Sequence, residues 1–224
     1  MAENLLKEGL LKLGLCGEER IFSLLTRYIE EIELFNSAYG LVKVSGRREL
    51  IVKHILDSLA PMDIIRDLLD GLSAGKNQPK IADVGSGAGL PGIPLAICMP
   101  GTGFTLIERM GRRAGFLRDA LAVLGLSNVW IEESEMEKFA LNPAGSGCFD
   151  LVVFRAFKPL ENTLVKDLVK LLVPGGIIAA YKGRRESMDK EITRLAEFMS
   201  REIIPLEVPF LEEERHLLLL RVKQ

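Results

Sequence analysis

Hydrophobic residues recur at helical spacing through the first third of the chain. Apolar positions fall three and four residues apart from Glu18 to Asn36 and again from Glu49 to Leu59. This spacing lines one face of an amphipathic helix. The breaker-rich stretch from Gly71 to Pro79 is typical of a linker. We therefore predict an N-terminal helical extension over residues 1–75 and a second domain over residues 76–224.

Beyond Lys80 the pattern changes, because short apolar runs alternate with helical segments. This alternation is typical of βαβ units and predicts an α/β fold, a Rossmann-like, seven-stranded and mostly parallel sheet. The last two strands, joined by a short charged link, should pair antiparallel at the sheet edge. Asp150 should precede the fourth strand, and Val173–Gly176 should form the turn into the fifth. The expected strands are Ile81–Val84, Phe104–Glu108, Val129–Ile131, Leu151–Phe154, Ile177–Tyr181, Ile203–Val208 and Leu217–Val222.

Composition narrows the class of protein. A chain of 224 residues that is 48% hydrophobic is long enough for one α/β domain and an extension. It lacks an apolar run of about 18 residues and a signal-peptide pattern, so we expect a cytoplasmic protein without a membrane span. Cys16, Cys98 and Cys148 are far apart, and His54 and His216 have no zinc-site spacing. Structural disulfides and a metal site are therefore not expected.

A glycine-rich turn follows the first strand. It reads Asp83-Val-Gly85-Ser-Gly87-Ala-Gly89-Leu90-Pro-Gly, and glycines let a backbone bend sharply and approach a ligand. The segment also matches GxGxxG, so a nicotinamide or flavin enzyme is an alternative. A carboxylate at Asp83 would repel a pyrophosphate at the helix N-terminus, whereas the cationic S-adenosylmethionine tolerates it. The turn thus favours S-adenosylmethionine.

Glu108 ends the second strand, where a carboxylate can accept hydrogen bonds from both ribose hydroxyls of a nucleoside cofactor. Together with the positions of Asp150 and of the Pro-Gly-Gly turn, this spacing is typical of a class I S-adenosylmethionine-dependent methyltransferase.

The sequence after the fourth strand limits the methyl acceptor. It reads Phe154-Arg155-Ala-Phe157-Lys-Pro and lacks the Asn/Asp-Pro-Pro-aromatic tetrapeptide usual in amine methylation. Cys148 has no neighbouring base that would make it the nucleophile for carbon methylation. A ring nitrogen such as guanine N7 needs no proton removed, so alignment and desolvation would suffice. Arg155 could then orient the base or the cofactor, and Phe157 could stack on a ring.

Several motifs between about Phe35 and Arg221 resemble the bacterial small-subunit (16S) ribosomal RNA guanine-N7 methyltransferases, the glucose-inhibited division protein B family. The unbroken Gly-Leu-Pro-Gly-Ile-Pro run is the most specific of them. The motifs are His54-Ile-Leu-Asp57-Ser58, Asp83 to Ala96, Leu106-Ile-Glu108, Arg112-Arg113-Ala-Gly-Phe-Leu117, Leu124 to Val129, Phe149-Asp150, Arg155-Ala-Phe157, Leu172 to Gly176, Lys182-Gly183 and Glu214-Arg215-His216.

The resemblance implies S-adenosylmethionine as cofactor and the small ribosomal subunit, with its 16S rRNA, as partner of a monomeric enzyme. The expected cofactor contacts are Asp83, Gly85, Gly87, Gly89, Leu90, Glu108, Met136, Glu137 and Arg155. Because the net charge is −2 and the pI about 5.9, RNA binding should depend on local basic patches. The expected RNA contacts are Arg47, Arg48, Lys182, Arg184 and Arg185.

His54 and Asp57 stand three residues apart on a predicted helix and share a face. With Arg155 they are the candidate catalytic residues, although a hydrogen-bonded structural pair is the favoured interpretation of His54 and Asp57. The chain departs from the family pattern at Gly40-Leu-Val and Glu135-Met-Glu. A methyltransferase for a small molecule or protein, a non-catalytic S-adenosylmethionine-binding protein and, last, a nicotinamide oxidoreductase are the alternatives.

Overall fold

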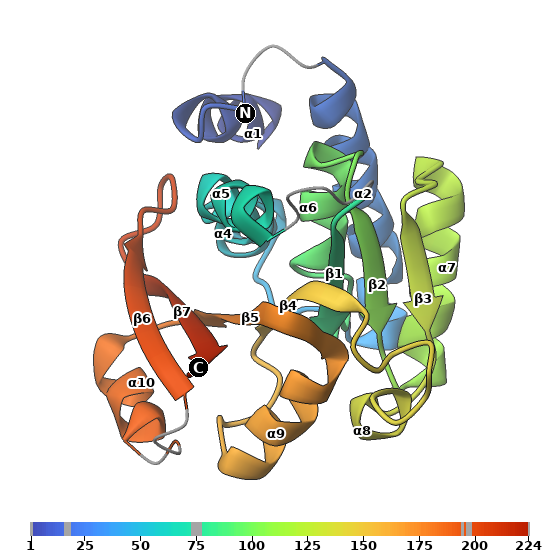
Figure 1. Cartoon of the computed structure of the whole chain (residues 1–224). Coiled ribbons are helices and arrows are strands. Elements are labelled where there is room, and N and C mark those ends of the chain that lie inside the picture. The colour runs from blue at the N-terminus through green and yellow to red at the C-terminus, as the bar shows by residue number, and fades with distance from the viewer. Residues whose placement is uncertain (1, 16–18, 73–77, 194, 196–198, 224) are drawn as a thin grey trace.

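The computed structural model describes residues 2–15, 19–72, 78–193, 195 and 199–223. Figure 1 shows a sheet that carries helices on both of its faces. The helices are α1 (Ala2–Lys12), α2 (Glu19–Tyr39), α3 (Arg47–Leu50), the π-helix η1 (Ile51–Leu56), α4 (Asp57–Leu59), α5 (Met62–Leu72), α6 (Gly92–Cys98), α7 (Gly111–Leu124), α8 (Met136–Phe139), α9 (Asn162–Leu171) and α10 (Arg185–Ile192). The strands are β1 (Lys80–Val84), β2 (Gly103–Ile107), β3 (Val129–Glu132), β4 (Phe149–Arg155), β5 (Leu172–Lys182), β6 (Met199–Leu206) and β7 (Arg215–Val222).

The seven strands lie in the order β3-β2-β1-β4-β5-β7-β6. The first five in this order pair in parallel, and β7 runs antiparallel to both β5 and β6. This confirms the predicted α/β class, the mostly parallel sheet and the antiparallel pair at its edge. The strand order reverses direction between β1 and β4, and ligands of open α/β sheets bind at such a switch point, outside the carboxyl ends of the strands.

Two predicted boundaries are wrong. Asp150 lies inside β4 and accepts a hydrogen bond from the Lys80 backbone N–H at 2.9 Å. The Val173–Gly176 segment lies inside β5, because Leu172 already pairs with Phe149 before the register shifts to Leu151 opposite Ile177. Between these two pairs β5 has more residues than β4, so β5 bulges there. The Pro-Gly-Gly sequence of this irregular segment is what made it look like a turn.

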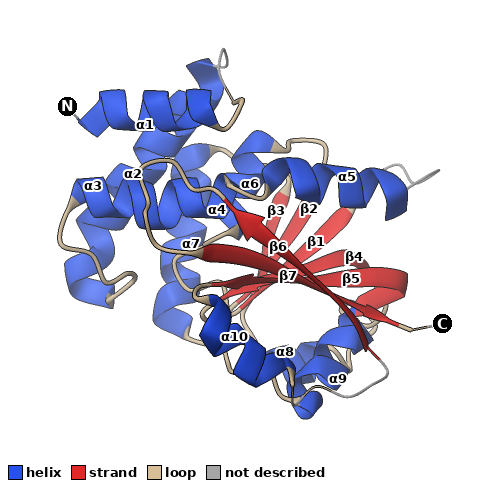
Figure 2. Cartoon of the chain, turned by 90° about the vertical axis from the view of Figure 1, so that its left-hand side faces the viewer, coloured by secondary structure: helices blue, strands red, loops and turns tan. Residues whose placement is uncertain are grey.

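Successive residues along a strand point to opposite faces of the sheet. Their buried side chains therefore form two separate clusters, one on each face. In β1, Ile81 packs with α2, α6 and α7, whereas Ala82 and Val84 pack with α8 and α9. Figure 2 shows the resulting layers, with α1, α2 and α4 to α6 on one side of the sheet and α8, α9 and α10 on the other. Burial on both faces explains why the parallel strands are continuous apolar runs.

The N-terminal helices share their core with the sheet. Leu25, Ile29 and Ile55 belong to the same buried cluster as Ile81 and Leu151. The predicted boundary between residues 75 and 76 lies outside the described residues, as does most of the predicted linker. The extension is thus packed as a layer of the same core, and it places its side chains against the glycine turn.

The predicted helix Glu49–Leu59 forms, but its centre is a π-helix over residues 51–56. A π-helical turn widens the backbone spiral, and such turns are frequent at functional sites. The π-helix ends at Leu56, directly before Asp57, and the segment carries His54 and Asp57 toward Arg155 at the carboxyl end of β4.

Candidate active site

The turn after β1 depends on glycine at positions that other residues rarely adopt. Gly85, Gly87 and Gly89 have φ values of 68°, 59° and 89°, in the left-handed region where a Cβ atom is disfavoured. The backbone N–H groups of Gly85 and Ser86 donate to the carbonyl of Ile107 at 2.9 and 3.2 Å. The turn is therefore held against the end of β2, with its backbone open to the cavities described below.

Asp83 shapes the turn from beneath. Its side chain is 1% exposed, and Oδ2 accepts a hydrogen bond from the Gly92 N–H at 2.8 Å. Oδ1 is buried and has no partner among the described residues. Burial, the largest cause, raises the pKa of Asp83 to about 7. Strand alternation points Asp83 toward α6, and neither cavity beside the turn is lined by it, so Asp83 supports the turn from below, while its contact with a cofactor stays a prediction.

Gly89 also faces away from the cavities. A Cβ atom there would come within 2.5 Å of Ile93 Cδ1 and 3.0 Å of Leu117 Cδ2. Glycine at this position permits close packing of the turn against α6 and α7, and the expected cofactor contact of Gly89 stays a prediction.

Glu108 connects the glycine turn to the start of α7. Its carboxylate is 4% exposed, and its two oxygens accept from the backbone N–H groups of Gly87 at 2.9 Å and Met110 at 2.8 Å. Each carboxylate oxygen has a second lone pair, so both can still accept a ribose hydroxyl. The carboxylate is thus fixed at the end of β2, where the sequence placed a ribose acceptor.

Two adjoining cavities open beside the turn. A larger one has a volume of about 800 Å³ and a smaller one of about 490 Å³. Glu108, Met136 and Glu137 line the smaller cavity, and Leu90 and Arg155 line the larger. Both cavities are lined by Gly85, Arg113, Ala156, Phe157 and Lys158.

Phe157 lies at the boundary of these cavities. Ala156 adopts a φ of 50°, which turns the chain sharply at the end of β4. The Phe157 ring then lies against the backbone of Gly85, where an added Cβ would come within 2.2 Å of the ring. The Lys158 amino group lies 5.1 Å from the ring centroid and pairs with Glu137 at 2.8 Å. The aromatic ring predicted to stack therefore lies between the smaller and the larger cavity.

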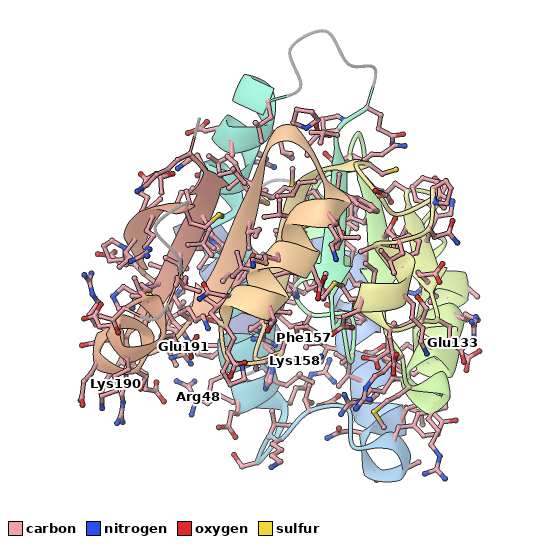
Figure 3. The ribbon with its side chains drawn as sticks, turned by 60° about the horizontal axis from the view of Figure 1, so that its bottom comes forward. Arg48, Glu133, Phe157, Lys158, Lys190 and Glu191 are labelled. Atoms are coloured by element: carbon pink, nitrogen blue, oxygen red, sulfur yellow. The ribbon has the colours of Figure 1, made fainter. Side chains whose placement is uncertain are left out.

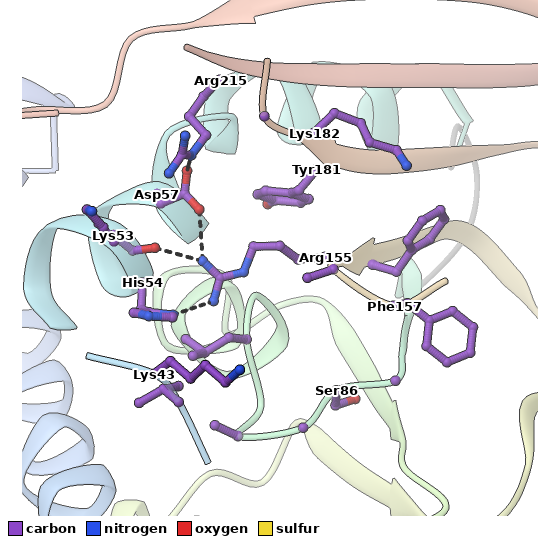
Figure 4. A pocket seen from close by; sticks show the side chains of 18 of the residues that line it. Lys43, Lys53, His54, Asp57, Ser86, Arg155, Phe157, Tyr181, Lys182 and Arg215 are labelled. Atoms are coloured by element: carbon purple, nitrogen blue, oxygen red, sulfur yellow. Dashed lines mark hydrogen bonds and ion pairs between the residues drawn. The ribbon is translucent and has the colours of Figure 1, made fainter. Parts of the chain in front are cut away.

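Arg155 joins the end of β4 to the π-helical segment (Figure 4). Its Nη1 donates to Asp57 Oδ2 at 2.8 Å and to the Lys53 carbonyl at 2.9 Å, and its Nη2 contacts His54 Nδ1 at 2.8 Å. The candidate catalytic residues Arg155, His54 and Asp57 are thus brought together. They contact one another through Arg155, and His54 and Asp57 do not form the direct pair that their spacing suggested.

His54 is held as a neutral ring. Burial and the neighbouring Arg155 charge lower its pKa to about 4. Because a guanidinium can only donate, Nδ1 must accept, and the proton of the neutral ring is on Nε2. Its other contact is with the backbone of Lys43. Both nitrogens therefore have partners, and His54 fixes the segment that carries Lys43 to the wall of the larger cavity.

The structure adds contacts to which the sequence assigned no role at the site. Arg215 Nε donates to Asp57 Oδ1 at 3.0 Å, so the Asp57 carboxylate pairs with two guanidinium groups. Tyr181 donates to the Ser58 carbonyl at 2.9 Å, and Tyr28 of α2 donates to the Ala88 carbonyl of the glycine turn at 2.6 Å. Buried tyrosines need such partners, but the sequence signal was only an aromatic residue in an apolar pattern.

The predicted RNA contacts are not gathered in one place. Arg47 pairs with Glu33 at 2.6 Å, and Arg185 pairs with Asp189 at 2.9 Å. Arg47 and Arg48 line a separate cavity beside the link between β6 and β7. Among the described residues, Arg48 and Arg184 have no ion pair, and Arg48 extends from the surface in Figure 3.

Lys182 is the member of that predicted set that lines the larger cavity. Additional basic side chains line it as well, so its wall is more strongly cationic than the sequence suggested. These are Lys43, Lys53, Arg113, Lys158 and Arg215.

The described part of the chain contains no helix long and apolar enough to cross a membrane. Within it, no group of three or more His, Cys, Asp or Glu side chains could hold a metal ion. Cys98 is buried and Cys148 is partly exposed, and Cys16 lies outside the described residues.

Solved structures with a similar fold are methyltransferases. A Klebsiella pneumoniae protein provisionally assigned as an O-methyltransferase superposes with a TM-score of 0.61 at 15% identity, covering 97% of this chain and 96% of that one. An rRNA methylase from Streptococcus thermophilus superposes with a TM-score of 0.51 at 16% identity, covering 73% and 97%. At these identities the likeness concerns the fold, which is that of class I S-adenosylmethionine-dependent methyltransferases.

Sequence relatives define the family. A Treponema pallidum protein named ribosomal RNA small subunit methyltransferase G is 42% identical over 87% of this chain and 82% of its own length. Proteins of the same name from Stenotrophomonas maltophilia and Nitrosococcus oceani are 38% and 35% identical, covering 95% and 100% of this chain and 91% and 97% of theirs. The family model described as GidB, rRNA small subunit methyltransferase G, matches residues 21–218. With its glycine turn and its cation-lined cavity, this chain belongs to the GidB family of rRNA small subunit methyltransferases G.

Proposed function

We propose that this protein is an S-adenosylmethionine-dependent methyltransferase that methylates N7 of a guanine in 16S rRNA, in the cytoplasm and as a monomer. The observation that carries the proposal is the cation-lined cavity of about 800 Å³ that adjoins the glycine turn of a GidB-family chain. A polyanionic substrate needs positive charge beside the transferable methyl group, and the cavity wall supplies it although the whole chain has a net charge of −2.

The smaller cavity has the chemistry that an S-adenosyl nucleoside requires. Gly85 presents backbone without a side chain, Glu108 is fixed as an acceptor for ribose hydroxyls, and Met136 supplies a buried apolar surface at the adenosine end. S-adenosylmethionine supplies an electrophilic methyl group when it is bound. The fit supports these residues, together with Glu137, as the cofactor site.

The larger cavity suits an acceptor that attacks without losing a proton. His54 Nδ1 is occupied by the Arg155 guanidinium, and the Asp57 carboxylate pairs with two guanidinium groups, so neither side chain is arranged as a general base. Guanine N7 has a lone pair in the base plane and needs no base. The residues then act by orientation and exclusion of water: Phe157 offers a stacking face, and Arg155 holds the turn that carries it.

RNA phosphates would be neutralised around the cavity mouth. Lys43 and Arg113 line the cavity and have no ion pair among the residues that the structure describes. Arg48 and Arg184 are the two predicted RNA contacts that likewise have no ion pair among the described residues. We propose that these four residues bind phosphate, which predicts that methylation weakens steeply as salt concentration rises.

The test uses small ribosomal subunits from a bacterial strain that lacks the corresponding enzyme. The protein is incubated with them and radiolabelled S-adenosylmethionine, and the RNA is digested to nucleosides. Label recovered as N7-methylguanosine supports the proposal, and the Glu108→Ala variant is the negative control. Cofactor binding without label in RNA would instead indicate a binding protein, and label in protein or in small molecules would indicate a different acceptor.

A further inference from the structure

Most polar side chains of the larger cavity have their hydrogen-bonding capacity used within the protein. Asp57 is paired with Arg155 and Arg215, and the Tyr181 hydroxyl donates to a backbone carbonyl. Lys53 is bound by two glutamates at 3.1 and 3.0 Å. Among the described residues, the groups without a partner are therefore the best placed to recognise a base that enters this cavity.

Glu191 is the carboxylate that remains. It lines the cavity, and its side chain is 28% exposed. Its Oε2 accepts from the Lys182 ammonium at 2.5 Å and from the Leu160 backbone N–H at 3.1 Å. Its Oε1 has no hydrogen bond among the described residues. The carboxylate is thus held in place by one oxygen and offers the other to the cavity.

The contact with Leu160 places this carboxylate beside the loop that carries the stacking ring. Leu160 is three residues beyond Phe157, and both α10 and this loop lie at the same end of the molecule, where Figure 3 labels Glu191, Phe157 and Lys158. Lys43 and Ser86 of the glycine turn line the same cavity and are labelled in Figure 4, and Lys43 has no ion pair among the described residues. The cavity therefore contains both an unpaired acceptor atom on Glu191 and an unpaired donor on Lys43.

An unpaired acceptor together with an unpaired donor favours the binding of guanine over adenine. Guanine presents two donors, N1–H and the 2-amino group, on one edge and two acceptors, O6 and N7, on the other. Adenine has no proton on N1 and carries an amino donor next to N7, which would face the Lys43 ammonium. A carboxylate can only accept, so it rejects any base that does not present donors to it.

Resting on the proposed function, we propose that Glu191 selects guanine by accepting hydrogen bonds from its N1–H and 2-amino groups. As N7 forms its bond to the methyl carbon, the carbon–sulfur bond of the sulfonium breaks, its electron pair stays on sulfur and S-adenosylhomocysteine leaves. The positive charge thus passes from sulfur to the purine, and no proton is lost. N1–H becomes a stronger donor at that moment. The contact with Glu191 is therefore stronger in the transition state than in the bound substrate and raises the rate of the chemical step.

The experiment replaces single chemical groups on both partners. Small subunits are reconstituted with rRNA in which the guanosine that the wild-type protein methylates is either retained or replaced by inosine, which lacks the 2-amino group. Single-turnover rates are measured at saturating protein for wild type, Glu191→Gln and Glu186→Gln. Glu186 is the matched control, because it lies on the same helix with an 83% exposed side chain that pairs with Lys190.

We expect wild type to methylate inosine about tenfold more slowly than guanosine, the size of one lost charge-assisted hydrogen bond. Glu191→Gln should slow guanosine methylation by at least the same factor. This variant should methylate inosine less than about threefold more slowly than guanosine, because the carboxylate and the 2-amino group contact each other and the loss of one removes the effect of losing the other. Glu186→Gln should behave as wild type. The thermal midpoint and the S-adenosylmethionine affinity of Glu191→Gln should match wild type.

Other results overturn the inference in identifiable ways. If the wild-type protein methylates guanosine and inosine at equal rates, the inference is wrong, whatever the variants show. A Glu191→Gln protein that keeps the full tenfold inosine penalty would also overturn it, since the glutamate would then act only on the fold of the loop. If wild type labels no guanosine at all, the proposed function itself fails, and this outcome is distinct from both of the others.

Discussion

Replacing Asp83 by asparagine should change how the stability of the protein depends on pH. The carboxyl group is buried, and its pKa of about 7 compares with an ordinary value of 3.8. One pKa unit corresponds to about 1.4 kcal/mol, so an ionised Asp83 costs the folded state up to about 4 kcal/mol well above pH 7. The asparagine keeps an oxygen for the Gly92 N–H and has no charge to bury.

The sign follows from proton binding. Between pH 3.8 and about 7 the folded protein retains a proton on Asp83 that the unfolded chain has released, so stability falls as pH rises through this window. The asparagine side chain of the variant does not titrate. The free energy of unfolding of the variant minus that of wild type should therefore rise with pH, by about 3 kcal/mol between pH 5 and pH 9.

Urea unfolding at pH 5, 6, 7, 8 and 9 measures this difference. The Oδ1 position is buried without a hydrogen-bond partner, so an amide group there lowers the free energy of unfolding by an amount that does not change with pH. The informative quantity is therefore the slope of the free-energy difference against pH. Asp63→Asn is the control, because that side chain is 79% exposed. Parallel pH profiles for wild type and Asp83→Asn would refute the buried-charge reasoning.

Three further changes separate the cofactor site from the RNA-binding surface. Tyr28→Phe removes the hydroxyl that holds the glycine turn and should lower the free energy of unfolding by about 1 kcal/mol while weakening S-adenosylmethionine binding, as measured by urea unfolding and titration calorimetry. Glu108→Ala should lower cofactor affinity at least tenfold with the fold retained, as seen by calorimetry and circular dichroism, because both the ribose acceptor and the partner of two backbone N–H groups are lost. Arg184→Glu combined with Arg185→Glu should reduce methylation of small subunits and leave cofactor affinity unchanged, because repulsion by RNA phosphates replaces attraction.

Each of these has a result that contradicts it. A Tyr28→Phe protein with wild-type cofactor affinity would mean that the N-terminal layer does not position the turn. Unchanged calorimetric affinity in Glu108→Ala would remove the ribose contact. Full methylation by the doubly substituted arginine variant would place the RNA-binding surface elsewhere, while the exposed Lys190→Glu change serves as its control for charge alone.

Local pattern was sufficient for the elements of the fold. Every predicted strand forms. The five parallel strands were recognisable as short apolar runs, because a parallel sheet is covered on both of its faces. The strand bounds differ where pairing decides them: β6 begins at Met199 because it pairs with Val222, a partner that no local pattern names. Residue 73 to residue 77 of the predicted linker lie outside the described part of the chain.

The candidate site was only partly accessible from sequence. Gly85 and Glu108 were found because a turn after a strand and a strand-end carboxylate have fixed places in this fold. The sequence did not predict to which face of the sheet the Asp83 side chain points. A side chain just before the turn can point to either face, and only the packing against α6 selects one. Arg215 and Tyr28 were missed, because each acts on a partner more than 50 positions away.

The amino-acid sequence alone determined the succession of strands and helices, the glycine turn and the family motifs, since these depend on hydrophobic period and on backbone conformations that are encoded within a few neighbouring residues. Only the tertiary structure decided which charges cancel. Arg47 looks like an RNA contact in the sequence but pairs with Glu33 of α2, 14 positions away, whereas Lys43 and Arg113 keep their charge at the cavity. Electrostatic pairing depends on distance in space, which the chain order does not contain.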